Sequence, residues 1–222
     1  MKIIGHRGGT AEKNQQNTLN AVKAAVQNGL EAIEIDVRVS RDNVVLLNHD
    51  DHVEHDGQSL LIRTSSFKQL KDLQSDITTL SEVFSIAQSK LKLLIEIMPV
   101  EPVGPVISVI RQALNHGWQA KDIQLCSFDL SILKALQQDL PQVQLAVSES
   151  WSGVRATHRA RSLKTKSLIM NQRWLWIGYV RPLANRGYDI AAYVVNDSKR
   201  ARKLARMGVG TIISDYPKRL AK

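Results

Sequence analysis

The stretch Ala32-Ile33-Glu34-Ile35-Asp36-Val37 alternates branched apolar residues with acids. In a β-strand successive side chains point to opposite faces, so Glu34 and Asp36 share one face while the apolar residues share the other. Two carboxylates this close repel each other, and burial makes the repulsion worse unless a cation lies between them. The stretch therefore predicts a buried strand with a pair of acidic groups on its inner face.

A second strand of the same kind follows at Leu93-Leu94-Ile95-Glu96-Ile97, where one acid stands within an apolar run. Hard divalent cations such as Mg²⁺, Ca²⁺ and Mn²⁺ prefer oxygen ligands. Glu34, Asp36 and Glu96 are therefore candidate metal ligands. The alternative is that all three are exposed acids on amphipathic strands.

These two strands belong to a regular alternation of short apolar runs with helical patterns. The strand patterns lie at 3–5, 32–37, 91–97, 123–126, 143–147, 167–170, 190–195 and 211–213. Such alternation predicts an α/β fold with a parallel sheet, and eight units predict closure into a (β/α)₈ TIM barrel. An open, doubly wound sheet is the alternative. Barrel enzymes carry their active groups at the C-terminal ends of the strands, where His6, Asp36 and Glu96 fall.

The alternation is interrupted once, after the second strand. A polar turn at 41–43 between apolar runs predicts a hairpin over residues 38–47. Residues 52–77 are polar and weakly periodic, and they predict a small insertion over the active site. With 222 residues, the whole chain (1–222) is expected to form one domain.

Composition points to a globular protein, with 43% hydrophobic residues and no apolar run near the ~20 residues that span a bilayer. The chain enters its first strand at once, so we expect no signal peptide. The lone Cys126 cannot form an internal disulfide and is expected to be a buried, small apolar residue. A cytoplasmic location follows from these features.

The net charge of +9 is unevenly distributed, because residues 151–222 carry 16 Lys and Arg against three Asp. A basic segment of this kind is compatible with contact to nucleic acid or to an anionic membrane. Solvated helix faces explain most of it, and no nucleic-acid recognition motif is present, so we expect no nucleic-acid partner and at most weak contact with an anionic membrane. The oligomeric state is open.

An ordered set of motifs resembles the glycerophosphodiester phosphodiesterase family. The set covers nearly the whole chain and consists of Gly5-His6-Arg7-Gly8, Gln16-Asn17-Thr18-Leu19, Glu34-Ile35-Asp36-Val37, His49-Asp50, Thr79-Leu80-Ser81-Glu82-Val83, Ile95-Glu96-Ile97, Ser127-Phe128, Tyr193-Val194-Val195-Asn196 and the segment 208–217. Each motif alone is weak, but their order is specific.

The resemblance implies a metal-dependent phosphoric diester hydrolase of lipid and glycerol metabolism. Its small-molecule substrate would be a glycerophosphodiester, cleaved to sn-glycerol 3-phosphate and an alcohol. By the same resemblance, the metal (Mg²⁺ or Ca²⁺) is held by the three acids named above, and His6 and His49 are the catalytic acid and base. Arg7 and Tyr193 are expected to bind substrate, with a salt bridge to a carboxylate as the alternative for Arg7.

Three departures from the family pattern concern the predicted site. Gln16 stands where the family usually has Glu, Met98 where it usually has Lys, and Tyr193 where it usually has Trp. Loss of the lysine removes a charge-assisted hydrogen bond, which is worth roughly 1.5–3 kcal/mol in general. The rival functions are therefore a lysophospholipase D, with its groove formed by 52–77 and the Trp174–Trp176 region, and a divergent non-catalytic phosphate-binding protein. Whether water or a neighbouring substrate hydroxyl attacks phosphorus is also open.

Overall fold

The wall of the molecule is a closed barrel of parallel strands. The computed structural model describes residues 1–10, 12, 15–88 and 90–221. The barrel strands are β1 (Lys2–Gly5), β2 (Ala32–Val39), β6 (Lys92–Ile97), β7 (Ile123–Ser127), β8 (Gln144–Glu149), β9 (Ser167–Asn171), β10 (Asp189–Tyr193) and β11 (Thr211–Ser214). Strand β1 pairs with β11, and Gly5 pairs with Ile33 of β2, which closes the ring. The predicted (β/α)₈ barrel is confirmed, and this closure excludes an open, doubly wound sheet.

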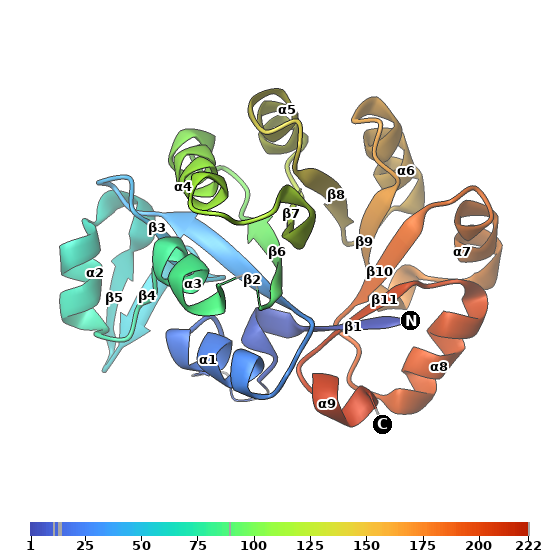
Figure 1. Cartoon of the computed structure of the whole chain (residues 1–222), viewed down its shortest axis with the longest axis horizontal. Helices are drawn as coiled ribbons and strands as arrows, with labels where there is room; N and C mark the ends of the chain where they lie inside the picture. The colour runs from blue at the N-terminus through green and yellow to red at the C-terminus, as the bar shows by residue number, and fades with distance from the viewer. Residues whose placement is uncertain (11, 13–14, 89, 222) are drawn as a thin grey trace.

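Helices surround the strands on the outside, as Figure 1 shows. They are α1 (Leu19–Gln27), α3 (Leu80–Ala87), α4 (Val103–Asn115), α5 (Leu130–Asp139), α6 (Gly153–Ser162), α7 (Ile177–Ala184), α8 (Ser198–Met207) and α9 (Pro217–Leu220). Short 3-10 helices lie at His6–Gly8, Ile62–Thr64, Ala120–Asp122 and Gln172–Trp174. Most boundaries agree with the sequence pattern, but the helix predicted for 174–185 begins at Ile177.

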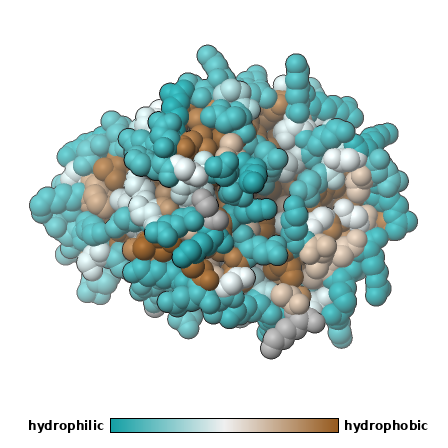
Figure 2. Space-filling view, viewed as in Figure 1, coloured by the Kyte–Doolittle hydropathy of each residue, from teal (hydrophilic) through white to brown (hydrophobic). Residues whose placement is uncertain are grey.

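The core has two layers, which follow from the alternation of side chains along each strand. The outward residues of β2, among them Ile33 and Ile35, pack with the helices in the main hydrophobic cluster. A smaller cluster fills the barrel interior and includes Leu94, Cys126 and Ile169. Figure 2 shows hydrophilic residues around the periphery of one face and hydrophobic residues visible between them. Because the interior cluster is apolar, the inward-facing acids of β2 lie next to an apolar layer inside the barrel.

An insertion follows β2, as predicted. Strand β3 (Val45–Leu47) pairs antiparallel with β2 and completes the predicted hairpin. The hairpin of β4 (His52–His55) and β5 (Gln58–Leu61) and helix α2 (Phe67–Leu73) then form an additional unit beside the barrel (Figure 1). This unit has its own small apolar cluster around Leu46 and Leu70. The hydrophobic residues of the insertion pack against one another in this cluster. The insertion therefore forms a unit of its own beside the barrel.

No helix within residues 1–10, 12, 15–88 and 90–221 has the length and apolar character needed to cross a lipid bilayer.

Candidate active site

A cavity of about 320 Å³ opens at the C-terminal ends of the barrel strands. Its lining includes every site residue predicted from the sequence, namely His6, Arg7, Glu34, Asp36, His49, Glu96 and Tyr193. No residue of the 52–77 insertion lines it within the described part of the chain, so the insertion flanks this cavity. Segments from both halves of the chain therefore meet at one site.

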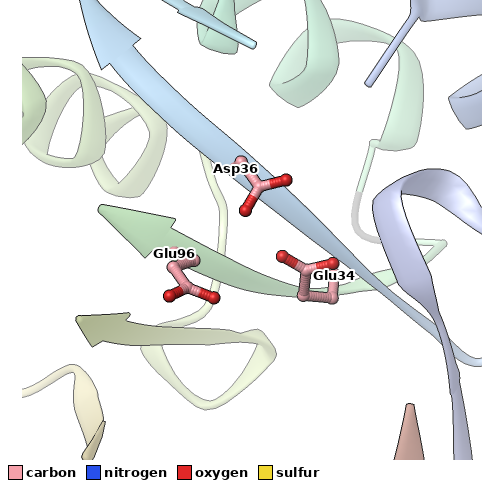
Figure 3. Close-up of side chains that lie close together, drawn as sticks. All are labelled: Glu34, Asp36 and Glu96. Carbon is pink, nitrogen blue, oxygen red and sulfur yellow. The ribbon is translucent and has the colours of Figure 1, made fainter. Parts of the chain in front are cut away.

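Strand register brings the three acids together. Strands β2 and β6 are parallel neighbours in which Asp36 pairs with Glu96, and Glu34 lies two residues earlier on the same face of β2. One carboxylate oxygen from each residue lies within 4.8 Å of the other two. Figure 3 shows the three side chains reaching from two strands into a common space.

Burial makes this cluster unfavourable when it is fully ionised. Burial, followed by the charges of Asp36 and Glu96, raises the pKa of Glu34 well above its ordinary value. Burial and the charge of Asp36 raise the pKa of Glu96 to about 8. In addition, Glu96 Oε1 is buried without a hydrogen-bond partner among the described residues. Such an arrangement is costly unless protons or a cation neutralise it.

The donor set fits a divalent metal. Three carboxylates supply the hard oxygen ligands that Mg²⁺ and Ca²⁺ prefer, and the orphaned Glu96 oxygen is an acceptor that points to a missing partner. Metal ions commonly keep additional water or substrate oxygens as ligands in such sites. The cluster can therefore hold the cation that the sequence suggests, and nothing in it selects Mg²⁺ over Ca²⁺.

Two residues that follow the first strand hold the acids in place. The Asn17 amide donates to Asp36 Oδ2 at 2.9 Å, and its oxygen accepts from the Asp36 backbone N–H at 3.1 Å. The Arg7 backbone N–H donates to Glu34 Oε2 at 2.9 Å. Arg7 Nε also lies 3.0 Å from Asp36 Oδ2, as an ion pair without hydrogen-bond geometry. Arg7 thus lines the cavity and also forms the carboxylate ion pair expected as its alternative role, while substrate binding by Arg7 stays a prediction.

His6 is oriented by an acid that the sequence analysis did not select. His6 Nδ1 lies 2.6 Å from Oδ1 of Asp215, which follows the last strand of the barrel. The Asn196 amide donates to the other Asp215 oxygen at 2.7 Å. Partial burial raises the pKa of Asp215, but the hydrogen bonds from His6 and Asn196 outweigh it, and the pKa lies below its ordinary value. The position of Asp215 directly after the last barrel strand is the sequence signal by which this residue could have been found.

His49 lies two residues after the end of β3. Its Nδ1 is 2.7 Å from Asp50 Oδ1, and its side chain is more exposed than that of His6. Its backbone carbonyl accepts from Arg38 Nε and Nη2 at 3.0 and 2.8 Å. Arg38 is in turn paired with buried Glu101 at 3.0 Å. A buried ion pair therefore anchors the backbone that carries this exposed imidazole.

Part of the remaining cavity wall is aromatic. The Tyr193 hydroxyl is 2.9 Å from Ser150 Oγ, and its ring meets Phe128 edge to face at 6.4 Å between centroids. Burial raises the pKa of Tyr193 to about 12. Tyr193 is therefore a neutral hydrogen-bonding group at neutral pH, and the substitution for Trp retains an aromatic wall.

Gln16 and Met98, the two other departures, also lie at the site. Gln16 Oε1 accepts from Arg7 Nη1 at 3.3 Å, so the neutral amide keeps a contact to the arginine. Met98 is nearly buried and lines the cavity two residues beyond Glu96. An apolar side chain therefore lines the cavity at the position where the family usually has lysine.

Comparison with known proteins agrees with this geometry. The model of the glycerophosphoryl diester phosphodiesterase family matches residues 6–219. A glycerophosphodiester phosphodiesterase of Caldanaerobacter subterraneus is 24% identical over 98% of this chain and 95% of that relative. The glycerophosphodiester phosphodiesterase structure from Thermotoga maritima superposes with a TM-score of 0.81 at 25% identity, covering 99% of this chain and 96% of that chain. The structure of an Oleispira antarctica phosphodiesterase in complex with its product sn-glycerol-3-phosphate gives a TM-score of 0.85 at 24% identity, covering 100% of this chain and 95% of that chain.

Barrel, cavity and comparisons together define a phosphoric diester hydrolase. The chain belongs to the glycerophosphoryl diester phosphodiesterase family, as the match over most of its length shows.

Proposed function

We propose that the protein hydrolyses a glycerophosphodiester to sn-glycerol 3-phosphate and an alcohol, and that the reaction requires Mg²⁺ or Ca²⁺ held by Glu34, Asp36 and Glu96. The observation that carries the proposal is the shared cavity, in which three clustered carboxylates and two imidazoles lie together. The product named in the Oleispira antarctica structure supports the choice of product. We also propose that the whole chain functions as one domain. The cytoplasmic location and the absence of a nucleic-acid partner stay predictions from the sequence.

In this proposal His6 and His49 are the proton-transfer groups. Phosphodiesters react slowly because their oxygens are negatively charged and the alkoxide is a poor leaving group. An imidazole near its pKa at neutral pH can donate a proton to the departing oxygen or accept one from the attacking hydroxyl. Asp215 accepts from Nδ1 of His6, which leaves Nε2 for this exchange.

The charged groups bind the phosphate. A bound divalent cation would withdraw charge from the phosphoryl oxygens and lower the barrier to attack. Arg7 adds guanidinium donors to the same cavity, which suit phosphate oxygens. Tyr193 and Phe128 form a wall for the glycerol or alcohol portion.

The test is release of choline or ethanolamine from the corresponding glycerophosphodiester, measured with EDTA and with added Mg²⁺ or Ca²⁺. We expect activity only with metal, and a loss of about 100-fold or more in His6→Ala and in His49→Ala. His158→Ala is the matched control, because His158 is exposed on α6 and should leave activity unchanged. Full activity in His6→Ala would refute the assignment.

A lysophospholipase D activity is the second candidate. It is favoured by the exposed indoles of Trp151 and Trp174, which lie in strand-to-helix connections at the same end of the barrel as the cavity. A panel of glycerophosphodiesters and lysophospholipids, assayed under the same metal conditions, separates the two activities. Ligand-induced thermal stabilisation without turnover of any substrate would instead support the non-catalytic phosphate-binding alternative.

A further inference from the structure

Large apolar side chains gather outside the cavity on one side of its mouth. We call them the aromatic patch, and its members are Trp151, Val154, Trp174, Trp176 and Ile177. Their exposed fractions are 70%, 82%, 48%, 63% and 48%. Single exposed apolar residues are ordinary, but a group of this size is typical of an interaction surface.

The patch belongs to the same end of the barrel as the cavity. Trp151 and Val154 follow β8, and the other three residues follow β9, so all lie in the connections or at the helix starts just after the C-terminal ends of adjacent strands. Ser150, directly before Trp151, lines the cavity and is hydrogen-bonded to Tyr193. A surface that met the patch would therefore lie next to the mouth of the active site.

Local packing holds the indoles outside the core. The rings of Trp151 and Trp174 lie 6.0 Å apart and connect the two loops. Leu175, between Trp174 and Trp176, is buried and anchors the loop from beneath. The Trp176 ring covers Gly178, where an added Cβ would lie only 1.9 Å from a ring atom. The patch is thus a supported surface of the folded protein.

Positive charge accompanies the patch. Residues 151–188 contain eight Lys and Arg and no Asp or Glu. Arg155 and Arg159 of this segment pair with Glu149. The cations at 164, 166 and 186 precede β9 and β10 at the other end of the barrel, so the free positive charge near the patch comes from two other residues. Arg173 directly precedes Trp174 in the sequence, and Lys199 is the second residue of α8, the helix after β10. Both are exposed, and neither forms an ion pair within the described part of the chain.

The opposite side of the cavity mouth is acidic. In the closed order of eight strands, β2 and β9 face each other across the ring. Strand β3, which pairs with β2, is followed in the chain by the exposed acids Asp50, Asp51 and Glu54. Charge is therefore unevenly distributed around the cavity mouth, and the side with the aromatic patch is the better suited to an anionic surface.

We propose that the aromatic patch docks the protein on the surface of an anionic phospholipid bilayer. Indole rings favour the boundary between lipid headgroups and acyl chains, and Val154 and Ile177 add apolar area. Lys and Arg near an anionic leaflet gain attraction from its negative potential. Binding to a protein partner does not require exposed cations beside the indoles. The combination of indoles with unpaired cations matches a lipid interface with anionic headgroups. The docking is independent of the hydrolytic activity.

Intrinsic fluorescence is a direct probe, because three of the four tryptophans lie in the patch and Trp118 is buried. We expect a blue shift with vesicles of phosphatidylcholine and phosphatidylglycerol, and none with phosphatidylcholine alone. Sedimentation with the same vesicles should give bound protein at low salt and less at high salt. No binding to the anionic vesicles, or equal binding to both kinds, would overturn the proposal.

Substitutions locate the contact. We expect Trp176→Ser to weaken vesicle binding about tenfold through loss of apolar burial, and Arg173→Glu to weaken it about fivefold or more through loss of attraction. The matched controls are Leu61→Ser, which removes an exposed apolar residue of the insertion, and Lys121→Glu, which reverses an exposed cation at the other end of the barrel. Equal weakening in variants and controls would refute the location. Self-association that depends on Trp176 without vesicle binding would assign the patch to a protein interface instead.

Discussion

His6 Nδ1 and Asp215 Oδ1 lie 2.6 Å apart although the two residues are 209 positions apart in the chain. Pairing of β1 with β11 closes the barrel and brings the two ends of the chain together. The hydrogen bonds to Asp215 keep its pKa low despite partial burial, so the carboxylate is ionised at neutral pH and can only accept. His6 Nδ1 is therefore the donor, which fixes the tautomer that presents Nε2 as the exchangeable nitrogen.

Asp215→Asn is expected to lower kcat/KM for the diester by about 100-fold or more, because an amide no longer selects this tautomer. Metal affinity should stay unchanged, since Asp215 lies outside the carboxylate cluster. Steady-state kinetics and metal titration of the same preparation test both points. Asp189→Asn, at the exposed start of β10, is the matched control and should retain activity. A full loss of metal binding in Asp215→Asn would show that the substitution disturbs the whole site.

The barrel and the acid cluster were predictable because both follow from the pattern of apolar and polar residues within single strands and helices. Alternation along 32–37 places Glu34 and Asp36 on one face, and parallel register then brings in Glu96. The partner of His6 was not predictable, because the contact depends on how the barrel closes. The start of α7 was also predicted three residues too early. Trp174 and Trp176 are exposed while Leu175 between them is buried, which is the alternation of an extended chain. The composition of this stretch nevertheless resembles that of a helix, and the helix begins only at Ile177.

Glu96→Gln is expected to reduce affinity for Mg²⁺ or Ca²⁺ by about tenfold or more, because it removes one of three charged ligands. The metal-free protein should at the same time be as stable as the original or more stable at neutral pH, since the buried Glu96 must take up a proton on folding and the neutral Gln need not. Thermal unfolding with EDTA and with metal measures both effects. Glu31→Gln, an exposed acid just before β2, should change neither. Unchanged metal stabilisation in Glu96→Gln would remove Glu96 from the ligand set.

The stability of the metal-free protein is expected to fall as pH rises from about 4.5 to about 8. Burial and Asp36 raise the folded-state pKa of Glu96 to about 8 from an ordinary value of 4.5. Between these values the folded state holds a proton that the unfolded chain has released, so the free energy of unfolding decreases with pH, by on the order of 1 kcal/mol per pH unit for one proton. Denaturant titrations in EDTA at several pH values measure the slope. The difference between the original protein and Glu96→Gln isolates this group, and a difference that is flat across the range would contradict the raised pKa.

Met98→Lys is expected to strengthen substrate binding by restoring the cation usual in the family. Met98 lines the cavity near Glu96, so an ammonium there would reach the phosphate or the carboxylate cluster. A charge-assisted hydrogen bond to the phosphate is worth roughly 1.5–3 kcal/mol, which corresponds to a KM lower by about tenfold or more. If the ammonium pairs with Glu96 instead, metal affinity falls and KM does not improve. Kinetics at saturating metal, with Met98→Leu as a control that conserves volume, separate these results. A KM that stays unchanged in Met98→Lys at every metal concentration would mean that this position does not face the phosphate.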